Sequence, residues 1–252
     1  MDLQLTGKTV IITGGSKGIG KGIATVFTEE GCNVVVNFRS DEAGAKEFAK
    51  ELTGNHVQAV AIQADVSKED GAKNLFEQAQ KIFGTIDILV NNAAGGFRPK
   101  PFQEISSGEW KLAEEGLLDP AFYMSKLFLQ HCIDNKKGGH IINLLSKSAI
   151  LSSSINNLPY VANKGALVSL TRGMAKEFIQ YGIYVNGIVP GYVRTERGHR
   201  DGDERTERVR KLLPSGEFAM PREMGNVAAI LASPLFKQMI GAVVDCTGGT
   251  LI

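Results

Sequence analysis

Short apolar runs alternate with longer stretches of helical periodicity along the whole chain. The runs are nearly continuous, as in Val34-Val35-Val36, which is typical of strands buried on both faces of a parallel sheet. We expect strands at 9–13, 33–37, 57–62, 86–90, 140–145, 183–189 and 242–246. We expect helices at 18–30, 42–52, 68–83, 159–181 and 222–232, and one that carries Phe122 and Cys132. This predicts an α/β fold with a doubly wound parallel sheet, helices on both faces and a single domain over 1–252.

The composition suits one large core and gives no sign of a nucleic-acid or membrane partner. The chain has 252 residues, 43% hydrophobic content and a formal net charge of +1, so no strong field attracts a polyanion. Cys32, Cys132 and Cys246 lie far apart, which indicates free thiols in a reducing compartment. The four histidines are scattered, so we expect no metal site. Because there is no signal-peptide pattern and no apolar run of roughly 20 residues, we expect a cytoplasmic protein.

A glycine-rich loop, TGGSKGIG, joins the first expected strand to the first expected helix. Glycines at such a turn let the backbone approach a pyrophosphate, which the positive end of the helix stabilises. Ligands of doubly wound sheets bind beyond the carboxyl ends of the strands. A tight turn without a ligand is the alternative. The loop predicts a dinucleotide site that includes Gly14, Ser16, Lys17, Gly18, Ile19 and Gly20.

The end of the second expected strand bears on the choice between NAD and NADP. A carboxylate there would accept hydrogen bonds from the ribose hydroxyls of NAD, but the chain reads Asn37-Phe38-Arg39-Ser40 and has no carboxylate before Asp41. Arg39 can fork onto a 2′-phosphate, and Lys17 offers a second cation. Each cation could instead be a solvated surface charge. We expect NADP(H) as the cofactor, held in part by Arg39 and Ser40.

Tyr160 and Lys164 are four residues apart in an expected helix, so they share one face. A lysine ammonium beside a phenol favours the phenolate, so we expect Lys164 to lower the pKa of Tyr160 and allow proton transfer near neutral pH. Serines precede the pair, among them Ser146 and Ser148. This arrangement predicts a proton donor beside a dinucleotide.

Several ordered motifs together resemble the short-chain dehydrogenase/reductase family over essentially the whole chain. They are TGGSKGIG (13–20), Asp65 in Ala-Asp-Val, NNAA (91–94), HIINLLS (140–146), YVANK (160–164) and Pro190-Gly191-Tyr192-Val193-Arg194-Thr195. The resemblance implies a Rossmann-type fold and hydride transfer with a nicotinamide. It also implies homodimers or homotetramers built from paired long helices, which the small and apolar residues along 162–178 would suit.

The resemblance also implies roles for individual positions. Asp65 would contact the adenine and Asn91 the adenosine ribose. Lys164 would bind the nicotinamide ribose and tune Tyr160, Thr195 would hold the carboxamide, and Ser146 would hydrogen-bond the substrate oxygen. The other expected cofactor contacts at the same motifs are Val66, Asn92, Ala93, Pro190, Gly191 and Val193.

The chain departs from the family pattern in four places. Counting seven residues from Trp110, where an asparagine often holds a relay water, reaches Leu117, which cannot hydrogen-bond through its side chain. The usual serine–tyrosine separation of thirteen falls between Ser146 and Ser148; the strand pattern favours Ser146, and Ser148 stays open. NNAAGGF (91–97) resembles enoyl-thioester reductases, whereas PKPF (99–102) resembles bacterial hydroxysteroid dehydrogenases. Glu217 replaces an arginine often found before the last helix.

The segment near 194–218, where the family places its substrate lid, is strongly charged. Its arginines are Arg194, Arg197, Arg200, Arg205, Arg208 and Arg210. A solvated loop-helix is one interpretation. Recognition of an anionic substrate, such as a phosphopantetheine or a carboxylate, is the other.

Three functions remain in play. The first is NADPH-dependent reduction of a carbonyl in a 3-oxoacyl thioester (as in fatty acid synthesis), a ketone or a steroid-like molecule, with Ser146, Tyr160 and Lys164 as the catalytic residues. The second is enoyl-thioester reduction, against which Asn157 stands where such enzymes often have their tyrosine. The third is a cofactor-binding scaffold or sensor, supported only by Leu117.

Overall fold

The computed structural model describes every residue except 55, 97, 152–154, 197–202 and 252. Seven parallel strands form one sheet in the order β3-β2-β1-β4-β5-β6-β7. The strands are β1 Thr9–Ile12, β2 Asn33–Phe38, β3 Ala59–Gln63, β4 Ile88–Asn91, β5 Gly139–Leu144, β6 Ile183–Pro190 and β7 Val243–Cys246. The order reverses between β1 and β4, so the predicted doubly wound α/β fold is confirmed.

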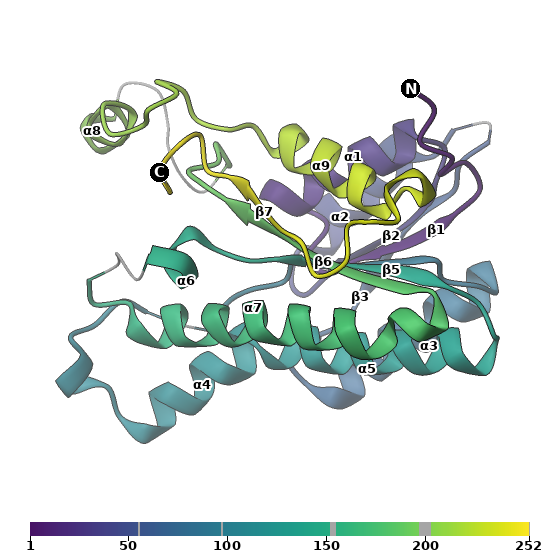
Figure 1. Ribbon diagram of the computed structural model, residues 1–252, viewed down its shortest axis with the longest axis horizontal. Coiled ribbons are helices and arrows are strands. Elements are labelled where there is room, and N and C mark those ends of the chain that lie inside the picture. The colour runs from purple at the N-terminus through teal and green to yellow at the C-terminus, as the bar shows by residue number, and fades with distance from the viewer. Residues whose placement is uncertain (55, 97, 152–154, 197–202, 252) are drawn as a thin grey trace.

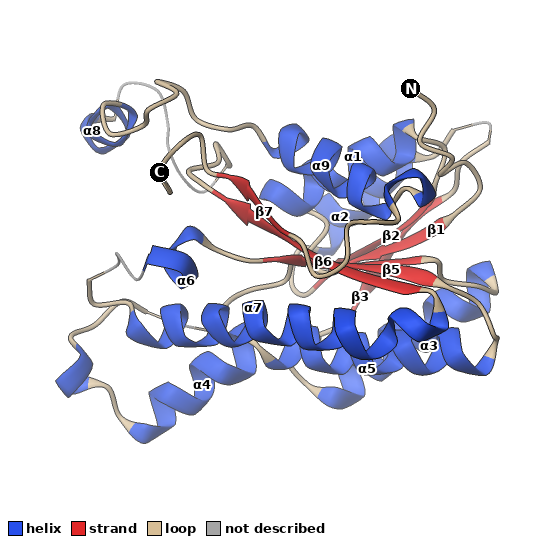
Figure 2. Ribbon diagram, in the orientation of Figure 1, coloured by secondary structure: helices blue, strands red, loops and turns tan. Residues whose placement is uncertain are grey.

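Helices cover both faces of the sheet (Figures 1 and 2). On one face lie α1 Gly18–Glu29, α2 Glu42–Leu52 and α9 Pro221–Ala232. On the other lie α3 Glu69–Phe83, α4 Ser107–Leu117, α5 Asp119–Asp134 and α7 Leu158–Phe178. Two short helices, α6 Lys147–Leu151 and α8 Glu204–Arg210, and the 3-10 turns η1 Phe102–Glu104, η2 Ile179–Tyr181 and η3 Pro234–Phe236 complete the described elements.

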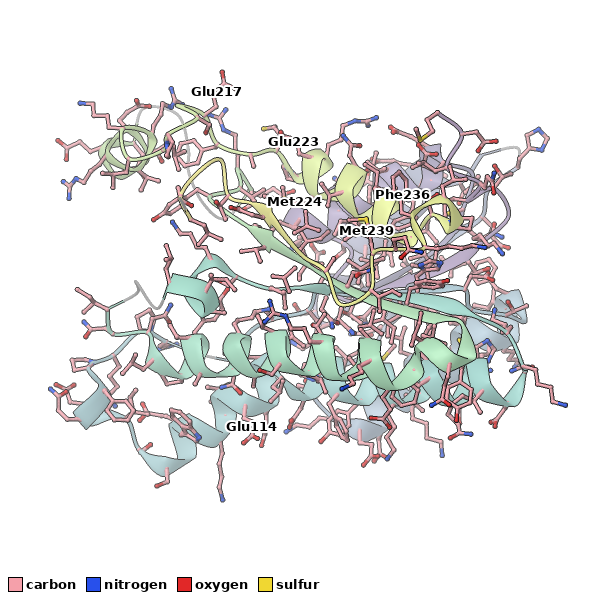
Figure 3. All side chains as sticks on the ribbon, viewed as in Figure 1. Glu114, Glu217, Glu223, Met224, Phe236 and Met239 are labelled. Carbon is pink, nitrogen blue, oxygen red and sulfur yellow. The ribbon has the colours of Figure 1, made fainter. Side chains whose placement is uncertain are left out.

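Alternation along the strands divides the interior into two main cores. Val10 and Ile12 of β1 face α1 and α9, whereas Ile11 faces α3 and α5. Neighbouring strands follow the same alternation, so each strand is apolar on both faces. Met224 is buried in the first core, and Phe236 and Met239 pack against that core from the segment after α9 (Figure 3).

Helices α1 and α9 approach each other through small residues. A Cβ on Gly22 would lie 2.3 Å from the carbonyl carbon of Pro221, and one on Gly225 would lie 2.7 Å from the carbonyl oxygen of Gly22. Only glycine allows this separation, which is far below ordinary contact. The first two turns of α1 are therefore fixed against the start of α9.

The expected elements form with shifted ends. The fourth strand begins at Ile88 rather than residue 86, and the Ile86 N–H donates to His131 Nε2 (3.2 Å). The helix expected to reach Tyr181 changes to 3-10 geometry after Phe178, and Gly182 ends it with a φ of +70°. Its positive φ is one that glycine adopts without strain. No helix of the described residues is long and apolar enough to cross a membrane.

Candidate active site

The glycine loop is fastened to the end of β4 by one threonine side chain. Thr13 Oγ1 accepts hydrogen bonds from the backbone N–H of Asn92 (2.9 Å) and Ala93 (3.0 Å), and donates to the Val90 carbonyl (3.3 Å). Asn92 Nδ2 donates in return to the carbonyls of Thr13 (2.9 Å) and Gly14 (3.1 Å). Two separate strand ends thus act as one rigid unit.

The loop has no room for side chains at its critical positions. A Cβ on Gly20 would lie 2.4 Å from the Gly14 carbonyl oxygen and 2.6 Å from Asn92 Nδ2. Gly14 and Gly18 have φ values of +61° and +54°, in the region that glycine favours. This is the close backbone approach that a bound pyrophosphate requires.

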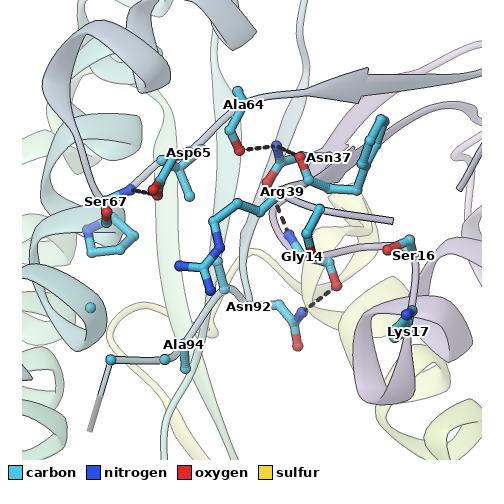
Figure 4. A pocket seen from close by; sticks show the side chains of 18 of the residues that line it. Gly14, Ser16, Lys17, Asn37, Arg39, Ala64, Asp65, Ser67, Asn92 and Ala94 are labelled. Carbon is cyan, nitrogen blue, oxygen red and sulfur yellow. Dashed lines mark hydrogen bonds between the residues drawn. The ribbon is translucent and has the colours of Figure 1, made fainter. Parts of the chain in front are cut away.

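Asn37 is a further support that the sequence analysis did not single out. Its Oδ1 accepts from the Gly14 N–H (3.1 Å), and its Nδ2 donates to the Ala64 carbonyl (3.1 Å; Figure 4). The side chain therefore joins the glycine loop to the segment after β3. Its position at the end of a buried strand, where valine would be ordinary, was the available signal.

A cavity of about 480 Å³ opens along the carboxyl ends of β1 to β4. The expected residues that line it are Gly14, Ser16, Lys17, Gly18, Arg39, Ser40, Asp65, Val66, Asn92, Ala93 and Thr195. Residues that the sequence analysis did not assign to the site also line it, among them Asn37, Asp41, Lys68, Leu112, Glu115 and Glu196. The other expected site residues are outside its lining, namely Ile19, Gly20, Asn91, Ser146, Tyr160, Lys164, Pro190, Gly191 and Val193.

The two cations expected at a 2′-phosphate have different surroundings. Lys17 Nζ forms an ion pair with Asp41 Oδ2 (2.6 Å), and Asp41 also caps α2 by accepting from the Gly44 N–H (3.1 Å). The hydrogen bond from Lys17 lowers the pKa of Asp41. Arg39 is exposed and points into the cavity between Asp65 and Ala94 (Figure 4). Arg39 is therefore the more available of the two.

Asp65 remains a carboxylate despite its partial burial. Desolvation alone would raise its pKa, but the hydrogen bonds from Ser67 and the charge of Arg39 outweigh that effect and lower it. The Ser67 N–H lies 3.1 Å from Asp65 Oδ1. The group is thus a fixed hydrogen-bond acceptor in the cavity wall.

A carboxylate lies at the positive end of α1. The Gly18 N–H donates to Glu196 Oε2 over 3.0 Å, and Thr195 packs within 3.3 Å of the position of a Gly18 Cβ. Glu196 is in the position of an anion at a helix N-terminus. The segment that follows β6 therefore contacts the glycine loop directly.

Ser146 and Tyr160 meet beyond the end of β5. A side-chain hydrogen bond joins them, which supports Ser146 over Ser148 as the partner of the tyrosine. Ser148 is buried, and its N–H donates to Ser146 Oγ (3.2 Å), so it positions the first serine. The strand pattern HIINLLS also favours Ser146.

The expected lowering of the Tyr160 pKa by Lys164 is wrong for this structure. Burial raises the pKa of Tyr160, and only the hydrogen bond with Ser146 opposes it. Lys164 is 3% exposed, donates to the Leu144 carbonyl (2.6 Å), and has a pKa lowered by burial to about 8. Desolvation is thus the largest cause of both pKa shifts.

The Asn91 side chain lies in the core, so the expectation that it faces an adenosine ribose is wrong for the side chain. Its Nδ2 donates to Ser125 Oγ (3.0 Å) and to Asn143 Oδ1 (2.8 Å), and Asn143 Nδ2 donates to Thr171 Oγ1 (2.8 Å). This buried chain joins β4 and β5 to α5 and α7. Asn91 follows Leu89 in the alternation of β4, so its side chain lies on the face that α3 and α5 cover.

Leu117 is 3% exposed and is the last residue of α4. The chain breaks helical geometry at Leu118, with φ −112° and ψ −48°, before α5 begins at Asp119. Leu117 packs into the interior at this break. Because the side chain is aliphatic, it can neither donate nor accept a hydrogen bond there.

The segment after β6 begins with a close backbone contact. A Cβ on Gly191 would lie 2.7 Å from Thr247, and Val193 forms a bridge with Ala219. Glu217 is exposed on the stretch that leads into α9 (Figure 3). Arg197 and Arg200 of the expected lid, and Phe97 of the NNAAGGF motif, lie outside the described residues.

The loop, cavity and cations fit a dinucleotide on the evidence of this chain alone. The backbone cradle would be filled by any Cβ at Gly20, and the cavity joins that cradle to Arg39 and Asp65. No group of three His, Cys, Asp or Glu side chains among the described residues is placed to hold a metal.

Comparison with known proteins gives consistent matches over almost the whole chain. A family model described as short chain dehydrogenase matches residues 8–206. Glucose 1-dehydrogenase 2 of Bacillus subtilis is 36% identical, over 98% of this chain and 95% of that protein. 3beta-hydroxysteroid dehydrogenase 1 of Eggerthella lenta is 37% identical, over 98% and 94%. A solved structure of 7 alpha-hydroxysteroid dehydrogenase complexed with NADH and 7-oxo glycochenodeoxycholic acid is 33% identical, with a TM-score of 0.89 over 98% and 96% of the chains.

Proposed function

The chain belongs to the short-chain dehydrogenase family, and from that premise we propose that it is an NADP(H)-dependent carbonyl reductase, or the reverse alcohol dehydrogenase. As a family member it is an oxidoreductase that acts on hydroxyl or carbonyl groups and uses a nicotinamide dinucleotide. The observation that carries the proposal is the hydrogen bond between Ser146 and Tyr160 beside the buried Lys164.

The three side chains have separate roles. Ser146 hydrogen-bonds the substrate oxygen and polarises the carbonyl. Tyr160 gives that oxygen its proton, and its raised pKa keeps the proton in place at neutral pH until it is needed. Lys164 would hold the nicotinamide ribose. The bound dinucleotide supplies or accepts the hydride.

Arg39 supports NADP(H) as the preferred cofactor. It is exposed, points into the cavity and has no ion pair among the described residues, so its fork is available for a 2′-phosphate. Lys17 reaches the same region but is paired with Asp41. We therefore assign most of the preference to Arg39, and expect Arg39→Asp to weaken NADP(H) binding about 10-fold or more and to favour NAD(H).

Carbonyl substrates are favoured over enoyl thioesters. Asn157, where an enoyl reductase of this kind often has tyrosine, is the N-cap residue of α7. The proton donor of this chain lies instead at Tyr160, one turn before Lys164. We propose a ketone or sugar-like or steroid-like alcohol, or a 3-oxoacyl thioester, as the substrate class.

Further proposals concern assembly and location. We propose a homodimer or homotetramer paired through α4, α5 and α7, where Phe122 and Leu112 are exposed. We propose residues near 194–218 as the substrate lid, supported by the bridge between Val193 and Ala219 at its two ends. Three free cysteines suit a reducing cytoplasm.

The decisive experiment is a cofactor and substrate panel followed by NADPH absorbance. It includes ketones, hydroxysteroids, glucose, acetoacetyl and crotonyl thioesters. Tyr160→Phe removes one hydroxyl and should reduce turnover of every accepted carbonyl by about 100-fold or more, while the dissociation constant for NADPH stays within a few-fold. Near-normal turnover by this variant would contradict the assignment. Tight NADPH binding without turnover across the panel would favour a scaffold or sensor instead.

A further inference from the structure

Lys147 directly follows Ser146 and has an aromatic platform. Its Nζ lies 3.8 Å from the centroid of the Tyr192 ring, a short cation–π contact. Tyr192 follows the Pro190-Gly191 turn at the end of β6, and β6 is the neighbour of β5. The contact therefore holds a positive charge between two adjacent strand ends, next to the serine that faces Tyr160.

The platform is itself supported by the lid segment. The rings of Tyr192 and Phe218 meet edge to face with centroids 6.5 Å apart, and the Arg210 guanidinium lies 5.9 Å from the Phe218 ring. Phe218 is 8% exposed, so this stack is largely fixed. Lys147 is thus held at one end of an ordered row of side chains.

Lys147 has no carboxylate partner among the residues that the structure describes. Two lysines near the carboxyl edge differ in this respect, since Lys17 pairs with Asp41 and Lys68 with Glu115. An ammonium over a ring face still has N–H groups directed away from the ring. A half-buried cation with free donors beside a reacting centre is suited to an anion.

Resting on the proposed function, we infer that the substrate of this enzyme carries a carboxylate or phosphate group near its reacting carbonyl, and that Lys147, on its Tyr192 platform, binds that group. The bound anion fixes which carbonyl meets Ser146 and Tyr160. The sequence analysis offered anion recognition by the arginines near 194–218 as one of two interpretations; the geometry favours Lys147, because its ammonium is held on Tyr192 and it directly follows Ser146.

The test compares anionic ketones with neutral counterparts of similar size. Acetoacetate and levulinate are paired with their amides, and dihydroxyacetone phosphate with dihydroxyacetone, so the two arms separate carboxylate from phosphate. The ratio of kcat/KM for anionic over neutral substrate should fall about tenfold or more in Lys147→Gln. Lys147→Arg should retain most of it. Lys81→Gln, which removes a charge at the far end of α3, is the matched control.

A measurement on the unaltered protein guards against variants that do not fold. Added NaCl should raise KM for the anionic substrates and leave KM for the neutral ones nearly unchanged. An unchanged ratio in a folded Lys147→Gln variant overturns the inference, as does an equal loss for both substrate kinds that Lys147→Arg does not restore. Turnover of neutral ketones with no preference for anionic ones overturns the inference but leaves the proposed function standing. Failure to turn over any carbonyl overturns both.

Discussion

The carboxyl edge of the sheet has two halves of different construction. In the cofactor half, formed by the glycine loop and the ends of β2 to β4, backbone groups are held by short-range hydrogen bonds from Thr13, Asn37 and Asn92. In the other half, which we call catalytic after its proposed function and which is formed by Ser146, Tyr160, Lys164 and the described residues of 194–218, buried polar side chains have shifted pKa values and aromatic stacking replaces the backbone network. The first half holds the main chain in a fixed position, and the second half presents side chains suited to proton transfer.

The comparison shows that a rigid main chain and reactive side chains are found in different halves of this edge. The cofactor half costs little free energy on folding, because its polar groups are exposed or hydrogen-bonded. The catalytic half holds an amine that is 3% exposed and a phenol whose pKa is raised by burial. Such groups are unfavourable for folding and are typical of active sites.

The largest expected effect comes from a substitution that disrupts only the cofactor half. Gly20→Ala places a Cβ 2.4 Å from the Gly14 carbonyl and 2.6 Å from Asn92 Nδ2, so the loop must move and lose the Asn92 hydrogen bonds. We expect dinucleotide affinity to fall at least about 30-fold, with a loss of about 1–3 kcal/mol in stability. Fluorescence titration measures the dinucleotide affinity, and denaturant unfolding measures the stability.

The matched control is Gly173→Ala on α7, where a Cβ meets nothing within 4 Å. It should keep full affinity and gain up to about 1 kcal/mol of stability from helix propensity. Equal affinity in the two alanine variants would show that the loop does not need its close backbone contact.

The next-largest effect concerns the free-energy cost of burying a charged group in the catalytic half. Burial lowers the pKa of Lys164 in the folded protein from its ordinary value of 10.5 to about 8, so the unfolded chain binds more protons between these pH values. Stability should therefore rise with pH through this window, and the full penalty should apply below about pH 8. Lys164→Met removes the group, so at pH 7 it should be more stable by about 1–3 kcal/mol while losing activity.

Urea unfolding at pH 7, 8, 9 and 10 checks this prediction. The stability difference between Lys164→Met and the unaltered protein should shrink as pH rises. Lys176→Met, which changes an exposed lysine of the same helix, should show no such trend. A destabilised Lys164→Met variant with a pH-independent difference would mean that the hydrogen bond to Leu144 matters more than burial.

The smallest effect concerns the contact between the two halves. Glu196 accepts from the Gly18 N–H at the site where a pyrophosphate is expected, so a bound dinucleotide must displace a like charge. Glu196→Gln should tighten dinucleotide binding about twofold to fivefold. Calorimetric titration of NADPH measures it, with Glu217→Gln as an exposed control on the same segment. Weaker binding by Glu196→Gln would indicate that the carboxylate helps to order the loop.

Sequence could predict the cofactor half because its chemistry depends on residue types that have few other uses. Glycines after a buried strand imply close backbone approach, and Arg39 after β2 implies a charged ligand. Asn37 was missed because its role depends on the segment after β3, which only the sheet order brings near. The ion pair of Lys17 with Asp41 was missed for the same reason.

In the catalytic half, the sequence led to residues that the structure brings together, Ser146 and Tyr160, but to the wrong direction for the shift of the tyrosine pKa. The strand pattern led to Ser146, and helical spacing joined Tyr160 to Lys164. Burial, which decides the direction of both pKa shifts, depends on packing from distant elements. The core position of the Asn91 side chain likewise follows from strand alternation and its partners on β5 and α5.

The bridge between Val193 and Ala219 joins the two ends of the segment between them. It has a consequence for how the substrate range of this enzyme can change. The Arg194 N–H donates to the Ala219 carbonyl and the Ala219 N–H to the Tyr192 carbonyl, while Pro221 rests on Gly22. The intervening stretch is therefore a loop whose ends are already joined, and doubling its length costs only about 0.6 kcal/mol in closure entropy. Insertions beyond Thr195 and Glu196, which contact the glycine loop at Gly18, would leave the sheet and that loop intact, so a new substrate range can arise by changing one segment.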